Sequence, residues 1–493
     1  MSFSMSLGEC LAPLQGSLTG DDVPFSGVSI DTRTLQPGDL YVAIQGEQFN
    51  GHDFVTAACD AGAHAIMVHE DVNVSLPVLK VANTQIALGR LARHWAKRFK
   101  IPTIAITGSN GKTTVKEIVA TILRQLGPVL STKGNLNNEI GVPLTLLEMR
   151  EDHLYAVIEM GANHAGEIAR LVEIAEPDVA VINNIGTAHL EGFGSVEGIA
   201  KAKSEIFSRL TDNGYAVINA DDNYADFMRG AAAHCRIREF GLKSNADVRG
   251  VPGAGLNIKT LGKTLSPRFR LSGDHNGMNA LAAVAAVQCL DIQAVNIVRG
   301  LENVRAVPGR LEKKPGAQGA LLIDDSYNAN PDSAQSAVNV LTKYPGTRYL
   351  VLGDMAELGA EAESMHARIG AYARQQGIDG LWTIGPLSSA AQKGFAESPK
   401  VVVSLAGGVT GKQKSAQQSA SSSNNAVQSA GAHFTDQELL IQDLRKYLAE
   451  GVTVLVKGSR SSRMERVVKG LLPSANSASA VVKPGSAMPE RSS

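Results

Sequence analysis

The sequence has few of the features that mark secreted, zinc-binding or nucleic-acid-binding proteins. Its four cysteines are scattered and include no Cys-x-x-Cys pair, so we expect neither a disulfide framework nor a zinc site, and a reducing cytoplasm fits this pattern. The 47 basic and 48 acidic side chains leave a net charge of −1. Without a basic excess, the chain has no electrostatic basis for binding nucleic acid or an anionic membrane.

Long apolar runs are also missing. The longest, at 280–287, is rich in alanine and much shorter than the roughly 20 residues that a helix needs to cross a bilayer. The N-terminus has no basic segment followed by an apolar core, so no signal peptide is expected. We therefore expect a cytoplasmic location, no membrane insertion, no nucleic-acid partner and a monomer.

The length of 493 residues is too great for a single hydrophobic core, and three domains are expected. Apolar strands alternate with helical patterns, which predicts an α/β fold. We expect a small α/β domain at 1–100, a central domain with a parallel sheet at 101–313, and a Rossmann-like domain without Gly-x-Gly-x-x-Gly at 314–472. Within the last domain, 406–431 is polar and of low complexity, and it is expected to be disordered, as is the tail at 473–493.

Nearly continuous apolar runs predict parallel strands that are buried on both faces. They lie at 101–107, 155–159, 179–183 and 215–220 in the central domain, and at 320–325, 349–352, 381–384 and 452–456 in the third. The first domain has strand candidates at 28–30, 40–44 and 65–68 and a helical stretch at 86–99. Polar residues follow many of these strands, and ligands of such sheets bind beyond the carboxyl ends of the strands.

The stretch at 104–118 has the clearest functional pattern, with a strand, a glycine turn and the start of a helix. Gly108 and Gly111 allow the turn and direct N–H groups at an anion, while Lys112 is placed to reach terminal phosphates and Thr113 to ligate Mg²⁺. Because Ile106 stands where the common phosphate loop has its first glycine, a chance glycine turn is the alternative. The expected phosphate-binding residues are Gly108, Ser109, Asn110, Gly111, Lys112, Thr113 and Thr114.

Other polar residues of the central domain have two interpretations each. Glu159 ends a predicted strand and is suited to ligate Mg²⁺, with a structural carboxylate as the alternative. A lone histidine such as His189 is more often a structural residue than a ligand, and Lys201 and Lys203 lie on a predicted amphipathic helix, where lysines are ordinarily solvated.

Three further groups are candidates for ligand contacts. Asn276 and Asn279 lie at the start of an alanine-rich helix, where they either cap the helix or present hydrogen-bonding edges to a nucleotide base. Arg310, near the end of the central domain, is able to contact phosphates. Arg33 either clamps a phosphate or carboxylate or forms an ion pair within its own cluster with Asp31.

In their order along the chain, these segments resemble the Mur ligase superfamily, whose members add amino acids to the peptidoglycan precursor. The shared segments are 107–113, 157–161, the residues around His189, 274–279, 308–310 and 325–327. Within the superfamily, the resemblance is greatest to the members that add D-alanyl-D-alanine, through 134–143, 161–167, 188–194, 325–331, 353–359 and 457–460. The similarity runs from Asp31 to Arg466 and leaves out the insertion and the tail.

The resemblance implies an ATP- and Mg²⁺-dependent ligase. The γ-phosphoryl group would pass to the terminal carboxylate of UDP-N-acetylmuramoyl-tripeptide, and the amine of D-alanyl-D-alanine would attack the resulting acyl phosphate. Lys112, Arg310 and Mg²⁺ would neutralise the charge that develops. By the same resemblance, Thr113 and Glu159 would hold one Mg²⁺ and His189 a second. We also predict that CO₂ carbamylates Lys203, which gives the second metal an anionic oxygen ligand.

The resemblance also implies where the substrates bind. Asn276 and Asn279 would lie near the adenine and Asp325 near the ribose, while Tyr327 stands where some relatives have a lysine. The UDP-N-acetylmuramoyl part would bind at Ser29, Asp31 and Arg33, and the peptide at Asn135, Asn137, Asn138, Asn163 and His164. The incoming dipeptide, which carries a carboxylate, would meet Lys457, Ser459 and Arg460.

Two rival functions remain at this stage. One is a sibling ligase that adds a different amino acid, although the Asp-Asn-Pro-Arg motif of the diaminopimelate-adding members is absent. The other is a nucleotide-binding regulatory module without ligase activity. Polar strand ends in all three domains disfavour the second, because a switch needs only one nucleotide site.

Overall fold

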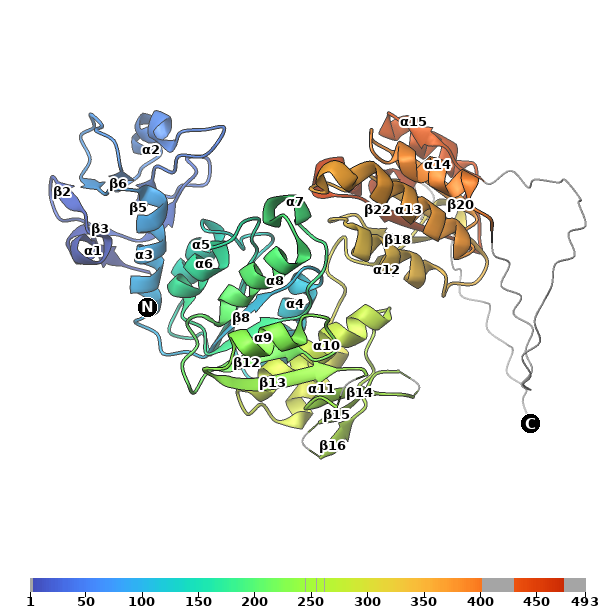
Figure 1. Cartoon of the computed structure of the whole chain (residues 1–493). Helices are drawn as coiled ribbons and strands as arrows, with labels where there is room; N and C mark the ends of the chain where they lie inside the picture. Colours follow the sequence, from blue (N-terminus) through green and yellow to red (C-terminus); the bar gives the residue numbers. More distant parts are fainter. Residues whose placement is uncertain (1–2, 244, 254, 261, 401–429, 474–493) are drawn as a thin grey trace, which may run out of the picture. The chain divides into compact units, whose positions relative to one another are not determined.

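The computed structural model describes residues 3–243, 245–253, 255–260, 262–400 and 430–473 (Figure 1). The chain forms two compact units, Met1–Arg305 and Ala306–Ser493. Apart from Ala430, Gly431 and Pro473, the predicted insertion at 406–431 and tail at 473–493 lie outside the described residues.

The beginning of the first unit is a five-stranded sheet with the order β2-β7-β6-β5-β4. Its strands are β2 (Ser17–Thr19), β4 (Gly27–Ser29), β5 (Asp39–Val42), β6 (Ala65–Val68) and β7 (Val78–Lys80), beside a separate pair of β1 (Met5–Ser6) and β3 (Pro24–Phe25). The helices are α1 (Leu7–Leu14), η1 (Gly51–Phe54), α2 (Val55–Asp60) and α3 (Thr84–Ala96). The three strands and the helix predicted here are confirmed, with ends that differ by a few residues.

The rest of the first unit is built on a nine-stranded sheet with the order β16-β15-β14-β13-β12-β11-β8-β10-β9. The strands are β8 (Thr103–Thr107), β9 (Val129–Ser131), β10 (Tyr155–Glu159), β11 (Val179–Ile182), β12 (Tyr215–Asn219), β13 (Arg236–Gly241), β14 (Val248–Val251), β15 (Asn257–Thr260) and β16 (Lys263–Leu265). The four predicted strands, now β8, β10, β11 and β12, pair in parallel as expected. The strands β9, β13 and β14, which were not predicted, extend the parallel part, whereas β14, β15 and β16 pair antiparallel.

Helices cover both faces of this sheet because its strands are apolar on both sides. They are α4 (Lys112–Leu123), α5 (Gly141–Leu147), α6 (Glu167–Ala175), α7 (Leu190–Phe193), α8 (Val196–Ser204), η2 (Glu205–Phe207), α9 (Ala225–Ala231), α10 (Asp274–Gln288) and α11 (Ala294–Asn303). Ile104 and Ile106 of β8 belong to the same core cluster as residues of α4, α10 and α11, while Ala105 joins a cluster with α3, α5 and α6. This alternation is what a strand buried between two helical layers requires.

The second unit has a six-stranded sheet with the order β17-β18-β22-β19-β20-β21. The strands are β17 (Glu312–Pro315), β18 (Leu321–Asp325), β19 (Thr347–Gly353), β20 (Gly380–Ile384), β21 (His433–Phe434) and β22 (Val452–Lys457). The helices are η3 (Ala317–Gly319), α12 (Pro331–Leu341), η4 (Gly359–Glu361), α13 (Ala362–Gln375), α14 (Ser389–Glu397), α15 (Gln437–Arg445), η5 (Arg460–Ser462) and α16 (Glu465–Leu471). All of its ladders are parallel except β17 with β18, so the predicted Rossmann-like alternation is confirmed.

The order of the strands reverses beside β8. The chain passes from β8 to the edge strand β9, returns to β10, and then crosses to β11 on the other side of β8. Such a reversal of strand order opens a crevice beyond the carboxyl ends of the strands. Among the helices in the described ranges, none has both the length and the hydropathy that crossing a bilayer requires.

Candidate active site

The turn between β8 and α4 is shaped by two glycines. Gly108 has φ 152° and Gly111 has φ 80°, in a region that favours glycine. A Cβ at Gly108 would overlap Oδ1 of Asn183, and one at Gly111 would lie 2.5 Å from Oδ1 of Asn279. Lys112 starts α4 and its Nζ donates to the Gly108 carbonyl at 2.7 Å, so the lysine folds back over the loop.

Two asparagines at the end of β11 hold this loop in place. Asn184 accepts from the backbone N–H of Asn110 through Oδ1 at 2.9 Å and donates to the Asn110 carbonyl through Nδ2 at 2.9 Å. Asn183 donates to the same carbonyl at 2.5 Å, and the Ser109 hydroxyl donates to the Gly186 carbonyl at 3.2 Å. Polar residues were expected at such strand ends, but Asn183 and Asn184 were not assigned to the site from the sequence.

Glu159 ends β10, which pairs with β8, and is 2% exposed. Its Oε1 accepts from Nδ2 of Asn137 at 2.8 Å, whereas its buried Oε2 has no hydrogen-bond partner among the described residues. An unpartnered buried carboxylate oxygen is costly unless a cation joins it. Thr113 and Thr114, in the first turn of α4, are also buried, at 7% and 9% exposed.

A chain of buried contacts supports Glu159 from behind. The backbone N–H of Glu159 donates to the Thr132 hydroxyl at 2.9 Å, and the Thr132 carbonyl accepts from Nζ of Lys116 at 2.6 Å. Lys116 is 2% exposed and also pairs with Glu117 at 2.7 Å. Thr132 and Lys116 were not assigned to the site from the sequence, because their contacts join elements that lie apart along the chain.

The loop at 134–141 carries three predicted peptide-channel residues with different surroundings. Asn137 contacts Glu159 as described, and its carbonyl accepts from the Gly161 N–H at 2.8 Å. Asn138 accepts from the Gly141 N–H at 2.9 Å and so caps the start of α5. The Asn135 carbonyl accepts from the Asn137 N–H at 2.8 Å, which tightens the loop.

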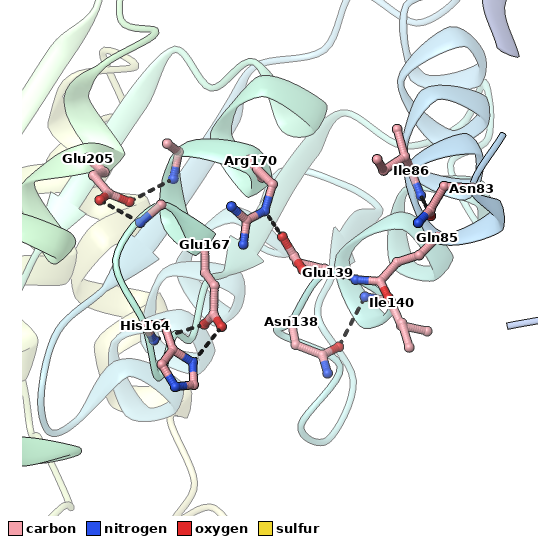
Figure 2. A network of polar contacts seen from close by, with 12 residues as sticks. Asn83, Gln85, Ile86, Asn138, Glu139, Ile140, His164, Glu167, Arg170 and Glu205 are labelled. Atoms are coloured by element: carbon pink, nitrogen blue, oxygen red, sulfur yellow. Dashed lines mark hydrogen bonds and ion pairs between the residues drawn. The ribbon is translucent and has the colours of Figure 1, made fainter. Parts of the chain in front are cut away.

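Figure 2 shows how the next residue of this loop, Glu139, lies between two helices. It accepts from Nε2 of Gln85 on α3 at 2.9 Å and pairs with Arg170 on α6. Glu139 therefore joins the helix that follows the five-stranded sheet to a helix that covers the nine-stranded sheet.

The predicted peptide-channel residues Asn163 and His164 lie in the turn before α6. Glu167 accepts from the Asn163 N–H at 2.8 Å and lies 3.1 Å from Nδ1 of His164 (Figure 2). Burial alone would raise the pKa of Glu167, but these hydrogen bonds lower it. Glu205 accepts from the Gly166 N–H at 2.8 Å and from the Ala169 N–H at 3.1 Å, which anchors the start of the helix.

Lys203 lies on α8 and is 0% exposed, whereas Lys201 on the same helix is exposed. Its Nζ has no hydrogen-bond partner within the described ranges and lies 5.9 Å from the centre of the Phe193 ring. Burial, and to a lesser degree the charge of Lys112, holds the pKa of the Lys203 amine well below its ordinary value. The expectation of a solvated lysine is therefore wrong for Lys203 and correct for Lys201.

The predicted metal ligand His189 directly precedes α7, with φ 61°.

The two asparagines of α10 contact each other, and one of them lies against the phosphate loop. Asn279 donates through Nδ2 to Oδ1 of Asn276 at 3.1 Å, and its own Oδ1 accepts from Asn183 at 3.4 Å. Asn276 donates to the Ser272 carbonyl at 2.7 Å. Both are 6% exposed. Asn279 is thus placed beside Gly111, while Asn276 closes the turn before the helix.

In the five-stranded sheet, the cluster after β4 is held by its own contacts. Arg33 donates to the Asp31 carboxylate through Nε at 2.9 Å and Nη2 at 2.6 Å, so the ion pair within the cluster is formed. The hydrogen bond from Arg33 lowers the pKa of Asp31 to about 2. Ser29 is buried and donates to the Asp31 carbonyl at 3.0 Å.

In the second unit, four predicted site residues form two pairs. The guanidinium of Arg310 lies 4.3 Å from the centre of the Tyr327 ring. Lys457 donates to Asp325 at 2.6 Å and to the Asn328 carbonyl at 2.9 Å, and Lys457 is 3% exposed. Because Lys457 is buried, its charge is already paired with Asp325.

Ser459 and Arg460 follow β22 and differ in exposure. Ser459 is 2% exposed, and its hydroxyl lies 3.0 Å from that of Ser461. The side chain of Arg460 is 69% exposed and pairs with Glu465 at 3.3 Å. The charge of Arg460 is therefore accessible to a ligand.

A histidine pair in the five-stranded sheet also brings metal-ligand atoms together. Atoms of His52, His69 and Glu70 lie within 4.8 Å of one another. However, Nε2 of His52 already accepts from the His69 N–H at 3.2 Å, and Nδ1 lies 2.7 Å from Oδ1 of Asn50. Because both ring nitrogens of His52 are used, we interpret this group as structural.

Comparisons with known proteins match this architecture over nearly the whole chain. Family models match in three parts, described as Mur ligase family, catalytic domain (24–107), Mur ligase middle domain (106–287) and Mur ligase, glutamate ligase domain (309–460). The chain is 42% identical to the UDP-N-acetylmuramoyl-tripeptide–D-alanyl-D-alanine ligase of Escherichia coli (strain K12), over 95% of this chain and 98% of that protein. It is 33% identical to the ligase of the same name from Bacillus subtilis (strain 168), over 91% and 93%.

Solved structures agree with these relatives. MurF from Acinetobacter baumannii matches with a TM-score of 0.84 and 33% identity, over 95% of this chain and 98% of that chain. MurF ligase from Thermotoga maritima in complex with ADP matches with a TM-score of 0.76 and 28% identity, over 90% and 96%. On the sequence relatives and the site geometry together, the chain belongs to the Mur ligase family.

Proposed function

We propose that the chain is an ATP-dependent ligase that joins D-alanyl-D-alanine to UDP-N-acetylmuramoyl-tripeptide. This is the ligation that the names of its relatives describe, and in our proposal it forms a C–N bond through an acyl phosphate. The observation that carries the proposal is the 42% identity to such a ligase over 95% of the chain. The phosphate loop and the unpartnered Glu159 oxygen supply the chemistry that this reaction needs.

The residues of the phosphate loop are suited to hold ATP. The positive-φ turn at Gly108 and Gly111 leads into the N-terminus of α4, where N–H groups and partial positive charge favour phosphate. Lys112 adds a full charge at the same place. The relative from Thermotoga maritima with ADP supports nucleotide binding by this fold. Asn276, Asn279, Arg310, Asp325 and Tyr327 are our candidates for the remaining contacts to the nucleotide.

The residues present also fit Mg²⁺. Oε2 of Glu159 is buried without a partner in the described part of the chain, and Mg²⁺ prefers such oxygen ligands. We assign one ion to Glu159 and Thr113 and a second to His189 and carbamylated Lys203. When bound, Mg²⁺ supplies the positive charge that offsets the repulsion between a triphosphate and a carboxylate.

For the substrates we propose the residues that the sequence predicts. Arg33 offers an exposed cation to the UDP-N-acetylmuramoyl part, with Ser29 and Asp31 shaping its turn. Asn135, Asn137, Asn138, Asn163 and His164 are our candidates for the peptide. For the carboxylate of D-alanyl-D-alanine we favour Arg460 over Lys457, because Lys457 is buried on Asp325.

An acceptor panel tests the proposal. ADP formation with UDP-N-acetylmuramoyl-tripeptide and Mg²⁺ should rise strongly on adding D-alanyl-D-alanine, and mass spectrometry should show the pentapeptide. Lys112→Ala should lower turnover by about 10³-fold or more, since the triphosphate loses its main cation. A greater response to single amino acids would favour a sibling ligase, and binding of ATP without any acceptor dependence would favour a regulatory module.

The location of the protein and its oligomeric state are also part of the proposal. The cysteines Cys10, Cys59, Cys235 and Cys289 are free thiols, in keeping with a reducing cytoplasm. We infer a cytoplasmic monomer, and light scattering behind a sizing column would measure its mass in solution.

A further inference from the structure

The segment Gly353–Gly359 resembles that of the D-alanyl-D-alanine-adding ligases, yet it supplies none of the groups assigned above. It follows β19, which is the neighbour of β22 in the sheet. The Asp354 carbonyl accepts from the Ser459 N–H at 2.9 Å and from the Ser462 hydroxyl at 3.2 Å. One backbone carbonyl therefore holds both ends of the turn that contains Arg460.

The two strand ends also pack without room for side chains. A Cβ at Gly353 would lie 2.8 Å from Sδ of Met464, and a Cβ at Gly458 would lie 3.2 Å from Cα of Gly353. At such a close approach, a shift of Asp354 must move Ser459 as well.

The side chain of Asp354 is fixed from the opposite side. Its Oδ1 accepts from the Leu387 N–H at 3.1 Å and from the Ser388 N–H at 2.8 Å, in the turn after β20. A carboxylate that accepts two backbone N–H bonds is held more firmly than by one neutral hydrogen bond. Asp354 thus ties the ends of β19, β20 and β22 together.

His366 fixes the next residue of the segment. It lies on α13 and is 0% exposed. Its Nε2 accepts from the Met355 N–H at 2.9 Å, so the neutral ring carries its proton on Nδ1, which donates to the Ala362 carbonyl at 2.7 Å. The imidazole bridges α13 to Met355, directly after Asp354.

We propose that Asp354 and His366 are positioning residues for the acceptor step, because they set the place of the Ser459–Arg460 turn. The inference rests on the proposed function, in which this turn receives D-alanyl-D-alanine. We assign neither side chain to contact with the reacting atoms. Each acts by fixing the Asp354 carbonyl, which holds the Ser459–Arg460 turn. Loss of either side chain should therefore weaken the binding of the dipeptide.

Substitutions of His366 test the inference in the full-length protein. His366→Leu leaves the Met355 N–H without its acceptor, and we expect the KM for D-alanyl-D-alanine to rise about tenfold. The KM for ATP should change less than about twofold. His366→Gln retains an acceptor and should give a smaller rise in KM. The matched control is His433→Leu, because His433 contacts Thr383 on another strand and not this segment.

A second measurement does not depend on activity. Amide exchange at 457–462 should be faster in His366→Leu than in the wild type or in His433→Leu. If His366→Leu does not fold, Asp354→Asn serves in both measurements, because it removes the charge and replaces one acceptor oxygen with an NH2 group while it keeps the size of the side chain.

Either of two results would overturn the positioning role: equal changes in both KM values, or unchanged exchange at 457–462. Failure of the proposed function looks different. The wild type itself would then form no ADP in response to the dipeptide, while the exchange measurement would still decide whether His366 holds the turn.

Discussion

At the residue scale, the burial of Lys203 differs most from expectation, because lysines on an amphipathic helix are ordinarily solvated. We predict that Lys203→Ala loses most activity, because alanine cannot form the proposed carbamate, whose oxygens would bind the metal. Small carboxylic acids should restore part of the rate by supplying the oxygens of the proposed carbamate. Steady-state turnover with and without such acids is the measurement, and Lys201→Ala is the matched control, since Lys201 is exposed on the same helix.

Carbamylation also has a direct signature. Labelled CO₂ trapped on the wild type should be absent from Lys203→Ala and present in Lys201→Ala. Full activity in Lys203→Ala would show that the buried amine has only a packing role.

His366 gives a second prediction at this scale, on the dependence of stability on pH. Burial lowers the pKa of His366 below its ordinary value, although the Ala362 carbonyl and the charge of Asp354 oppose this. Below about pH 6.5, the unfolded chain therefore binds a proton that the folded chain does not, and the free energy of unfolding falls as the pH drops. Urea unfolding at pH 7.5 and 5.5 should show a larger loss in the wild type than in His366→Gln. Equal losses would mean that His366 does not contribute.

The sequence predicted some of the site because strand ends are local features. Glu159 and Lys112 end or follow apolar runs, so their place at the crevice could be predicted. Asn183 and Thr132 could not be assigned, because their partners Asn110 and Glu159 lie on other elements of the sheet. Contacts of that kind depend on strand order, which a single sequence does not give.

At the element scale, long buried strands were predicted better than short polar ones. The runs at 155–159 and 65–68 match β10 and β6 exactly in extent, because buried parallel strands are apolar throughout. The hairpin of β15 and β16 was missed. Its burial alternates over only a few residues, which is too short a pattern to separate from a loop.

Two helical glycines give a matched test of packing between elements. A Cβ at Gly300 on α11 would overlap Cα of Ile122 on α4, whereas a Cβ at Gly230 on α9 meets nothing within 4 Å. We expect Gly300→Ala to lower the free energy of unfolding by about 1–3 kcal/mol, because the helices must separate. Gly230→Ala should raise it by about 0.5–1 kcal/mol through helix propensity. Urea unfolding measures both, and equal effects would contradict the close approach of α4 and α11.

At the scale of the whole molecule, three domains were expected, and three family models match successive parts of the chain at 24–107, 106–287 and 309–460. The first two of these parts lie within one compact unit, Met1–Arg305. The sheets near the expected border at 100 are indeed separate. However, one core cluster contains Leu40 and Met67 from the first sheet together with Ile158 from the second, through α3 and its neighbours. This buried cluster packs the first two expected domains against each other, and a change in composition along the chain does not reveal such packing.

The last prediction follows from the separate cores of the two units. Leu301 belongs to a cluster within Met1–Arg305 and Phe395 to a cluster within Ala306–Ser493, and both are 0% exposed. Truncation to alanine costs about 2–5 kcal/mol for leucine and 3–5 kcal/mol for phenylalanine. If each unit unfolds as its own cooperative block, calorimetry should resolve two transitions, with Leu301→Ala lowering one and Phe395→Ala the other. ATP with Mg²⁺ should raise the transition that Leu301→Ala lowers, because the phosphate loop lies in that unit. A single transition that both truncations lower equally would show that the units unfold together.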